Sequence, residues 1–149
     1  MKVAVLGAGG QLGSEFVKQL GDEAVPLYHS QPPAVDVCAP QVLMAVFEKL
    51  RTSWVVNTAA FHNVDECERS PEKAFMVNTY GALNVARAAS AVGARVVYIS
   101  TDYVFGDKGP WYPHSVPDPL NVYGVSKYAG EILTHLYCNC LLYTSPSPR

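Results

Sequence analysis

The stretch Lys2-Val-Ala-Val-Leu-Gly-Ala-Gly-Gly-Gln-Leu-Gly13 decides the fold of this 149-residue chain. Within it, Val3–Leu6 is a short apolar run with β-branched residues, which predicts a strand buried on both faces. The glycines that follow predict a tight turn into a helix whose first N–H groups face an anion. Gly7, Gly10 and Gly13 fit the spacing G-x-x-G-x-x-G, not the six-residue dinucleotide fingerprint. An ordinary glycine-rich turn remains the alternative for this stretch alone.

The composition predicts a single globular unit of modest charge. Hydrophobic residues make up 49% of the chain and the formal net charge is −2, without any run of Lys or Arg. We therefore expect neither a nucleic-acid partner nor a membrane partner, and we expect a cytoplasmic protein. The cysteines form no C-x-x-C pair, so we interpret them as reduced packing residues and expect no metal site. They are Cys38, Cys67, Cys138 and Cys140.

Short apolar runs alternate with helical patterns along the chain, which predicts an α/β fold with a Rossmann-type, doubly wound parallel sheet. The strands are expected to begin near Lys2, Ala24, Trp54 and Arg95, the last being the last clear strand. Helices are expected over residues 11–20, 41–50 and about 70–91, and from Asn121 onward. Val35–Val37 is interpreted as a brief strand, Phe61–Cys67 as a loop and residues 107–120 as a longer loop.

Ligands of open α/β sheets bind at the carboxyl ends of the strands. Ala59 and Ala60 follow the strand at Trp54 and leave room there for a ligand. The second strand ends in Tyr28-His29-Ser30, which offers neither the acid typical of NADH enzymes nor an Arg for a 2′-phosphate. The sequence therefore does not choose between NADH and NADPH.

Two polar residues keep two interpretations each. Asp36 either faces the adenine side of a cofactor or caps the helix that begins near Pro40. Asn78 either lies near an active site or occupies a solvated helix face.

Tyr123 and Lys127 are spaced i and i+4, which places the phenol and the ammonium on one helix face. We expect the cation to lower the tyrosine pKa, so that the phenol can protonate a carbonyl oxygen. Thr101, at the end of the strand from Arg95, can hydrogen-bond the same oxygen. An isolated Tyr-x-x-x-Lys is more often two surface residues, but together with the glycine turn and Ser100-Thr101-Asp102 it is specific.

These motifs together resemble the extended short-chain dehydrogenases/reductases, and within them the dTDP-4-dehydrorhamnose reductase family. The resemblance runs from Met1 to about Asn139. It rests on Gly7 to Gly13, on Val56 to Ala60 with Val64, Asp65 and Glu68, on Ser100 to Phe105, and on Pro119 to Gly124 with Ser126, Lys127, Gly130 and Glu131.

The resemblance implies specific roles. Tyr123 and Lys127 match the catalytic pair, Lys127 also holding the nicotinamide ribose, and Thr101 with Asp102 matches the contacts to the deoxyhexose. The implied contacts to NADPH or NADH are Gly7, Gly10, Gln11, Leu12, Gly13, Asp36, Val37, Ala60, Phe61, His62, Tyr123 and Lys127. The implied reaction reduces the C4 ketone of dTDP-4-dehydro-L-rhamnose to dTDP-L-rhamnose. The partner would be this nucleotide sugar, and a homodimer is the assembly to test in the full-length protein.

Two other classes use the same scaffold. One is the non-catalytic regulatory β subunit of methionine adenosyltransferase. The reductase is favoured over it by the intact Thr101, Tyr123 and Lys127. The other is a nucleotide-sugar epimerase or dehydratase that holds NAD tightly. His114-Ser115 departs from the reductase pattern, in which acidic residues are frequent at this place.

The last ten residues, Cys140 to Arg149, do not resemble the family. They look like translated read-through of a sequencing adapter, so we expect a Rossmann domain over residues 1–139, truncated after the catalytic helix, and a non-native tail over 140–149. A Ser/Pro-rich natural tail is the alternative. Such a truncation would remove the sixth strand of the sheet and leave the edge of the strand at Arg95 open.

Overall fold

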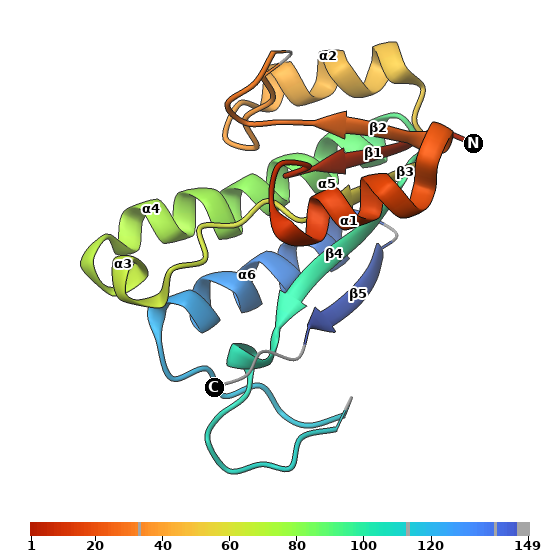
Figure 1. Cartoon of the computed structure of the whole chain (residues 1–149). Coiled ribbons are helices and arrows are strands. Elements are labelled where there is room, and N and C mark those ends of the chain that lie inside the picture. Colours follow the sequence, from red (N-terminus) through yellow and green to blue (C-terminus); the bar gives the residue numbers. More distant parts are fainter. Residues whose placement is uncertain (33, 113, 139, 146–149) are drawn as a thin grey trace.

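The computed structural model describes residues 1–32, 34–112, 114–138 and 140–145. Within these residues five parallel strands form one sheet in the order β2-β1-β3-β4-β5 (Figure 1). They are β1 (Val3–Leu6), β2 (Ala24–Leu27), β3 (Trp54–Asn57), β4 (Arg95–Thr101) and β5 (Cys140–Ser145). The first four begin at or next to the predicted positions, and all pairings are parallel, which confirms the predicted sheet.

The helices lie on both faces of the sheet, so the predicted doubly wound architecture is also confirmed (Figure 1). Helix α1 covers one face, and α2, α5 and α6 cover the other. The α-helices are α1 (Gln11–Leu20), α2 (Pro40–Leu50), α3 (Val64–Arg69), α4 (Pro71–Phe75), α5 (Gly81–Ala91) and α6 (Val122–Tyr137). A π-helical turn, η2 (Met76–Tyr80), joins α4 to α5, and two 3₁₀ turns are η1 (Gly21–Glu23) and η3 (Asp102–Val104). In the described part of the chain, no helix has both the length and the apolar character needed to cross a membrane.

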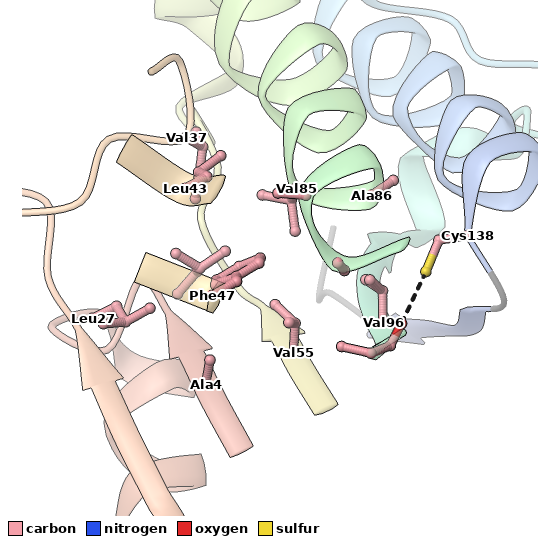
Figure 2. Close-up of a cluster of buried hydrophobic side chains, with 14 of the residues drawn as sticks. Ala4, Leu27, Val37, Leu43, Phe47, Val55, Val85, Ala86, Val96 and Cys138 are labelled. Carbon is pink, nitrogen blue, oxygen red and sulfur yellow. Dashed lines mark hydrogen bonds between the residues drawn. The ribbon is translucent and has the colours of Figure 1, made fainter. Parts of the chain in front are cut away.

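The larger core fills the space between the sheet and helices α2, α5 and α6 (Figure 2). Leu43 and Phe47 of α2 and Val85 of α5 are fully buried against the strands. Each side chain of this size contributes roughly 1.5–3 kcal/mol through burial. At the far end, the Cys138 thiol donates to the Ala94 carbonyl at 3.4 Å, which ties the end of α6 to the start of β4 (Figure 2).

The smaller core lies on the opposite face, under α1. Val3 and Val5 of β1 pack there with Phe16 and Val17 of the helix, while Ala4 and Leu6 point into the larger core. All four residues of β1 are therefore buried, as the apolar run predicted.

The predicted brief strand over Val35–Val37 is wrong. The structure has only an isolated parallel bridge between Tyr28 and Ala34, next to which the Val35 N–H donates to the Tyr28 carbonyl at 2.8 Å. The chain turns at once, because Oδ1 of Asp36 accepts the N–H of Cys38 at 2.8 Å. This side-chain bond competes with strand pairing, which residue preferences for extended structure do not take into account.

The predicted loop over Phe61–Cys67 is partly wrong, because helix α3 begins at Val64. Its start is stabilised by Asn63, whose Oδ1 accepts the N–H of Glu66 at 3.0 Å. Asn followed by Asp and Glu is a helix-start signal, but the helix is too short to show an apolar period in the sequence.

The expectation that the strand at Arg95 is the last one, with an open edge, is also wrong. Strand β5 pairs with β4 in parallel register from Val96 opposite Cys140 to Thr101 opposite Ser145. Strand pairing uses backbone groups, so an extended segment can join the sheet whatever its side chains. The non-native origin of residues 140–149 stays a prediction, and residues 139 and 146–149 lie outside the described part.

Gly7 should be less tolerant of substitution than a glycine of similar conformation in open space. Gly7 has φ +75°, and a Cβ there would lie 2.7 Å from Oγ1 of Thr58 and 2.9 Å from the N of Ala59. Gly93 has φ +71° with no atom within 4 Å of such a Cβ. We expect Gly93→Ala to cost about 1–2 kcal/mol for the left-handed backbone alone, and Gly7→Ala about 1–3 kcal/mol more for the added clash. Urea unfolding followed by circular dichroism measures both, and equal losses would contradict this reading of the turn.

Candidate active site

A cavity of about 750 Å³ opens at the carboxyl ends of β1, β3 and β4. The strand order changes direction here, since β2 lies on one side of β1 and β3 on the other. Open parallel sheets bind ligands at this kind of switch point. The cavity is lined by Gly9, Gly10, Gln11, Leu12, Gly13, Thr58, Ala60, His62, Val64, Ile99, Ser100, Thr101, Tyr103, Tyr123 and Lys127.

The glycine turn forms one wall of this cavity. Gly10 is the N-cap of α1, no side chain caps the helix, and its first residues line the cavity. Gly13 is buried against Gly7, and a Cβ at Gly13 would overlap the Gly7 carbonyl. The tight turn thus brings the start of α1 next to the end of β1, an arrangement that suits a phosphate group.

The opposite wall is the start of α6, which two side chains position. Oδ1 of Asn121 accepts the N–H of Gly124 at 2.7 Å, a standard N-cap bond. Oε1 of Glu68 in α3 accepts the N–H of Val122, also at 2.7 Å, and its charge suits a helix N-terminus. Gly124 lets the helix approach the turn η3, since a Cβ there would overlap the carbonyl of Tyr103. These contacts place Tyr123 in the first turn of α6, beside the cavity.

The Tyr123 hydroxyl lies beside Thr101, as predicted. Burial raises the pKa of Tyr123, and hydrogen bonding to Thr101 partly offsets this rise. The ring of Tyr103 meets the Tyr123 ring edge-on, with 5.6 Å between the centroids. The expectation of a lowered Tyr123 pKa is wrong, because burial is the largest influence and raises the pKa.

Lys127 is 3% exposed and reaches across to the end of β4. Its Nζ donates to the Ile99 carbonyl at 2.6 Å and lies 4.3 Å from the centre of the Tyr98 ring. Burial lowers the pKa of Lys127 from 10.5 to about 7, and the charge of Glu131 opposes this shift. At neutral pH the Lys127 side chain is therefore close to the midpoint between its ammonium form and its neutral amine form.

Asn78 is 2% exposed, which rules out the solvated-face interpretation. It lies in the π-helical turn η2, where its Oδ1 accepts the Phe61 N–H at 2.8 Å. Its Nδ2 donates to the Phe61 carbonyl at 2.9 Å and to Oγ of Ser126 at 3.0 Å. Asn78 thus joins the segment after β3 to the helix that carries Tyr123 and Lys127.

We expect Asn78→Ala to cost about 2–4 kcal/mol, because three buried or partly buried hydrogen bonds are lost together. Asn84→Ala is the matched control, since Nδ2 of Asn84 makes one bond, to the Val37 carbonyl at 3.0 Å, and should cost about 1 kcal/mol. Thermal and urea unfolding of both variants provide the measurement. A smaller loss for Asn78→Ala than for the control would show that Asn78 does not hold the segment.

The cavity gathers nine of the predicted site residues: Gly10, Gln11, Leu12, Gly13, Ala60, His62, Thr101, Tyr123 and Lys127. Five others lie outside its lining, namely Gly7, Asp36, Val37, Phe61 and Asp102. Gly7 lies in the turn itself, where its carbonyl accepts the Gly10 N–H at 2.9 Å. Asp102 begins the 3₁₀ turn η3, where its Oδ1 accepts from Oγ1 of Thr101 at 3.3 Å. The ligand roles of all fourteen stay predictions.

Asp36, Val37 and Phe61 make structural contacts. Asp36 is not the cap of α2, whose N-cap is Ala39, so that alternative is wrong. Besides the bond to Cys38, its carboxylate lies 3.8 Å from Nε2 of His29. Val37 is buried in the larger core, and Phe61 lies 4.5 Å from Nζ of Lys73.

Several residues that line the cavity were not predicted as site residues, among them Thr58 and Ser100. Oγ1 of Thr58 donates to the Leu6 carbonyl at 2.7 Å, which holds the ends of β1 and β3 together. The signal was present, since both residues lie at or just beyond the carboxyl end of a strand that carries the site. Position alone, however, does not tell which of these side chains faces the cavity.

The fold and the cavity define a Rossmann-type domain with a glycine turn on one wall and a Tyr-x-x-x-Lys helix on the other. Residues 1–142 match the family described as RmlD substrate binding domain, and the chain belongs to this family.

Curated relatives and solved structures extend the comparison. The chain is 39% identical to the spore coat polysaccharide biosynthesis protein SpsK of Bacillus subtilis, over 91% of this chain and 48% of that protein. It is 36% identical to the dTDP-4-dehydrorhamnose reductase of Escherichia coli, over 93% of this chain and 48% of that protein. The Bacillus anthracis dTDP-4-dehydrorhamnose reductase, solved in complex with NADP, superposes with a TM-score of 0.91 at 34% identity, covering 98% of this chain and 54% of that one. The chain thus spans about half the length of the curated relatives it matches.

Proposed function

We propose that this chain is the cofactor-binding half of a reductase. The enzyme reduces the C4 ketone of dTDP-4-dehydro-L-rhamnose with NADPH or NADH and forms dTDP-L-rhamnose. The observation that carries this proposal is that Thr101, Tyr123 and Lys127 meet the glycine turn in one cavity. The reductases among its relatives support the choice of substrate.

The residues present fit a nicotinamide dinucleotide. The uncapped start of α1 offers backbone N–H groups to a pyrophosphate, and the glycines leave no side chain between backbone and ligand. Gly10 to Gly13 would hold the phosphates, and Lys127 would hold the nicotinamide ribose. When bound, the cofactor would supply a hydride to the ketone carbon.

The side chains of this chain would handle the proton. Because burial raises the pKa of Tyr123, its phenol carries a proton at neutral pH and can donate it to the ketone oxygen as that oxygen becomes an alcohol. The Thr101 hydroxyl, beside the phenol, would hold the same oxygen in place. The ammonium of Lys127 would stabilise the phenolate that remains.

The proposal includes a nucleotide-sugar partner and a cytoplasmic location. Free cysteines at positions 38, 67, 138 and 140 are compatible with a reducing compartment. A homodimer of the full-length protein stays a prediction.

The proposal is tested with two proteins. The first is the isolated chain, titrated with NADPH and NADH by fluorescence. The second is a hybrid in which residues 1–139 replace the matching half of the Escherichia coli reductase. We expect weak cofactor binding by the isolated chain without measurable reduction of dTDP-4-dehydrorhamnose. The reaction rate depends on binding the nucleotide part of the substrate, and the residues expected to bind it lie beyond residue 139. We expect the hybrid to reduce it.

Three results would contradict parts of this proposal. Near-full activity of the isolated chain would show that the substrate site lies within it. A folded hybrid that binds cofactor but reduces no nucleotide sugar would favour a regulatory protein. NAD retained by the hybrid through purification would favour an epimerase or a dehydratase.

A further inference from the structure

Glu131 lies one helical turn beyond Lys127 on α6, and both side chains reach the same end of β4. Nζ of Lys127 donates to the carbonyl of Ile99 at 2.6 Å. The next residue of the strand, Ser100, donates its hydroxyl to Oε1 of Glu131. An ammonium and a carboxylate from one helix are therefore anchored on consecutive residues of one strand.

The Lys127 ammonium lies in a dry environment, whereas the Glu131 side chain is partly exposed. Lys127 is 3% exposed, and Ser100 is 4% exposed. Water and salt screen charges weakly in such a place, so a carboxylate acts on a nearby ammonium over several ångströms. Since Nζ bonds to a carbonyl oxygen, which carries no full charge, the compensating charge has to come from another group.

Glu131 supplies that charge. Its carboxylate raises the Lys127 pKa against the effect of burial, and Lys127 in turn lowers the Glu131 pKa, which burial raises. Tyr98 of β4 and Cys140 of β5 also face Glu131; burial raises the pKa of both, and the carboxylate adds to the rise, which keeps them neutral. Tyr123, one turn before Lys127, completes the titratable groups of this cluster and is likewise held neutral by burial.

The close packing of α6 on β4 keeps this arrangement in place. Gly130 allows it, since a Cβ there would overlap the carbonyl of Asn78 and press on the Tyr98 hydroxyl. That hydroxyl donates to the Lys127 carbonyl at 3.1 Å. The backbone between Lys127 and Glu131 is thus fixed against the strand on which both side chains end.

We propose that Glu131 is a positioning residue, whose carboxylate, anchored on Ser100, favours the ammonium form of the buried Lys127, one helical turn after Tyr123. This inference deepens the proposed function and rests on it, because the ammonium matters for reduction only if Lys127 serves the cofactor and the phenol. Glu131 touches neither substrate nor cofactor in this proposal and acts through Lys127.

The test measures the protonation of Lys127 directly in the isolated chain. Lysines labelled with ¹³C are followed by NMR from pH 5 to pH 10, and the Lys127 resonance is assigned by its loss in Lys127→Met. In Glu131→Gln we expect the Lys127 midpoint to fall by about one pH unit or more, a tenfold change in acidity, because the carboxylate charge is gone. Gln keeps the shape of the side chain and an oxygen that accepts from Ser100.

Two further variants make the test specific. Glu48→Gln removes an exposed carboxylate from α2 and should leave the Lys127 midpoint unchanged. Ser100→Ala frees the Glu131 carboxylate and should move the midpoint in the same direction by a smaller amount. A folded Glu131→Gln, or a folded Ser100→Ala if the former does not fold, with an unchanged Lys127 midpoint would overturn the proposal.

A second measurement separates this inference from the proposed function. In the active hybrid, Glu131→Gln should move the alkaline limb of the kcat/KM profile to lower pH by the shift that NMR records. A purely structural role would lower activity at all pH values without moving the limb. The NMR midpoint needs neither substrate nor cofactor, so it decides the role of Glu131 even if the hybrid reduces no nucleotide sugar.

Discussion

Replacing Tyr123 with Phe is expected to lower the turnover of the hybrid by roughly 10²-fold or more while cofactor affinity changes little. The hydroxyl is the proton donor in the proposed reaction and lies beside Thr101. The ring itself would stay in place, since it packs edge-on against Tyr103 with 5.6 Å between centroids. Turnover at saturating substrate and cofactor titration by fluorescence measure the two quantities separately.

Tyr137→Phe is the matched control, because it removes a tyrosine hydroxyl from the exposed last residue of the same helix. We expect this variant to keep full turnover. If Tyr123→Phe also kept its turnover, the proton would have to come from another group, and the assignment of Tyr123 would fail.

The free energy of unfolding of the isolated chain is expected to rise with pH above about pH 7, and Lys127 is the reason. Burial lowers its pKa from 10.5 in the unfolded chain to about 7 in the folded one. Between these values the unfolded state binds the extra proton, so raising the pH favours the folded state. The slope approaches about 1.4 kcal/mol per pH unit for one such group. Below pH 7 both states carry the charge, and the fold bears the full cost of burying it.

Lys127→Met should remove this slope and raise stability most at or below pH 7. The comparison is made by urea unfolding between pH 7 and about pH 8.5, because other groups act in the opposite direction at higher pH. Burial raises the pKa of Cys38 from 9.0 to about 11, so its contribution falls as the pH passes 9. Lys49→Met, which changes an exposed lysine of α2, is the control and should keep the wild-type slope. An unchanged slope in Lys127→Met would mean that Lys127 is solvated in the native state.

The sequence predicted those parts of the site that depend on local pattern. The i, i+4 spacing of Tyr123 and Lys127 and the glycine spacing before α1 are properties of single elements. Because parallel strands end at one edge of the sheet, these elements could be expected to meet there, and the cavity brings them together. The electrostatic state of the pair could not be predicted in this way, since it depends on how much water each group loses.

The predictions that the structure changed have a common cause. In each case a specific contact outweighs the preference of the local sequence for one kind of structure. Asp36 was placed in a strand, but its carboxylate turns the chain by bonding to Cys38 at 2.8 Å. The sequence allowed Asn78 to lie either near an active site or on a solvated helix face. Its hydrogen bonds to Phe61 and Ser126 decide that it is buried. The segment 140–145 was set aside as foreign to the domain, yet its backbone pairs with β4.

By itself, the sequence determined the alternation of strands and helices, the parallel sheet and the residues brought to its carboxyl edge, because apolar period and glycine position act over a few neighbouring residues. Only the tertiary structure decided that Lys127 is buried against Ile99, that Glu131 is anchored on Ser100 and that burial raises the Tyr123 pKa. The physical reason is that solvation and charge depend on atoms far apart in the chain, and these atoms become neighbours only when α6 packs on β4.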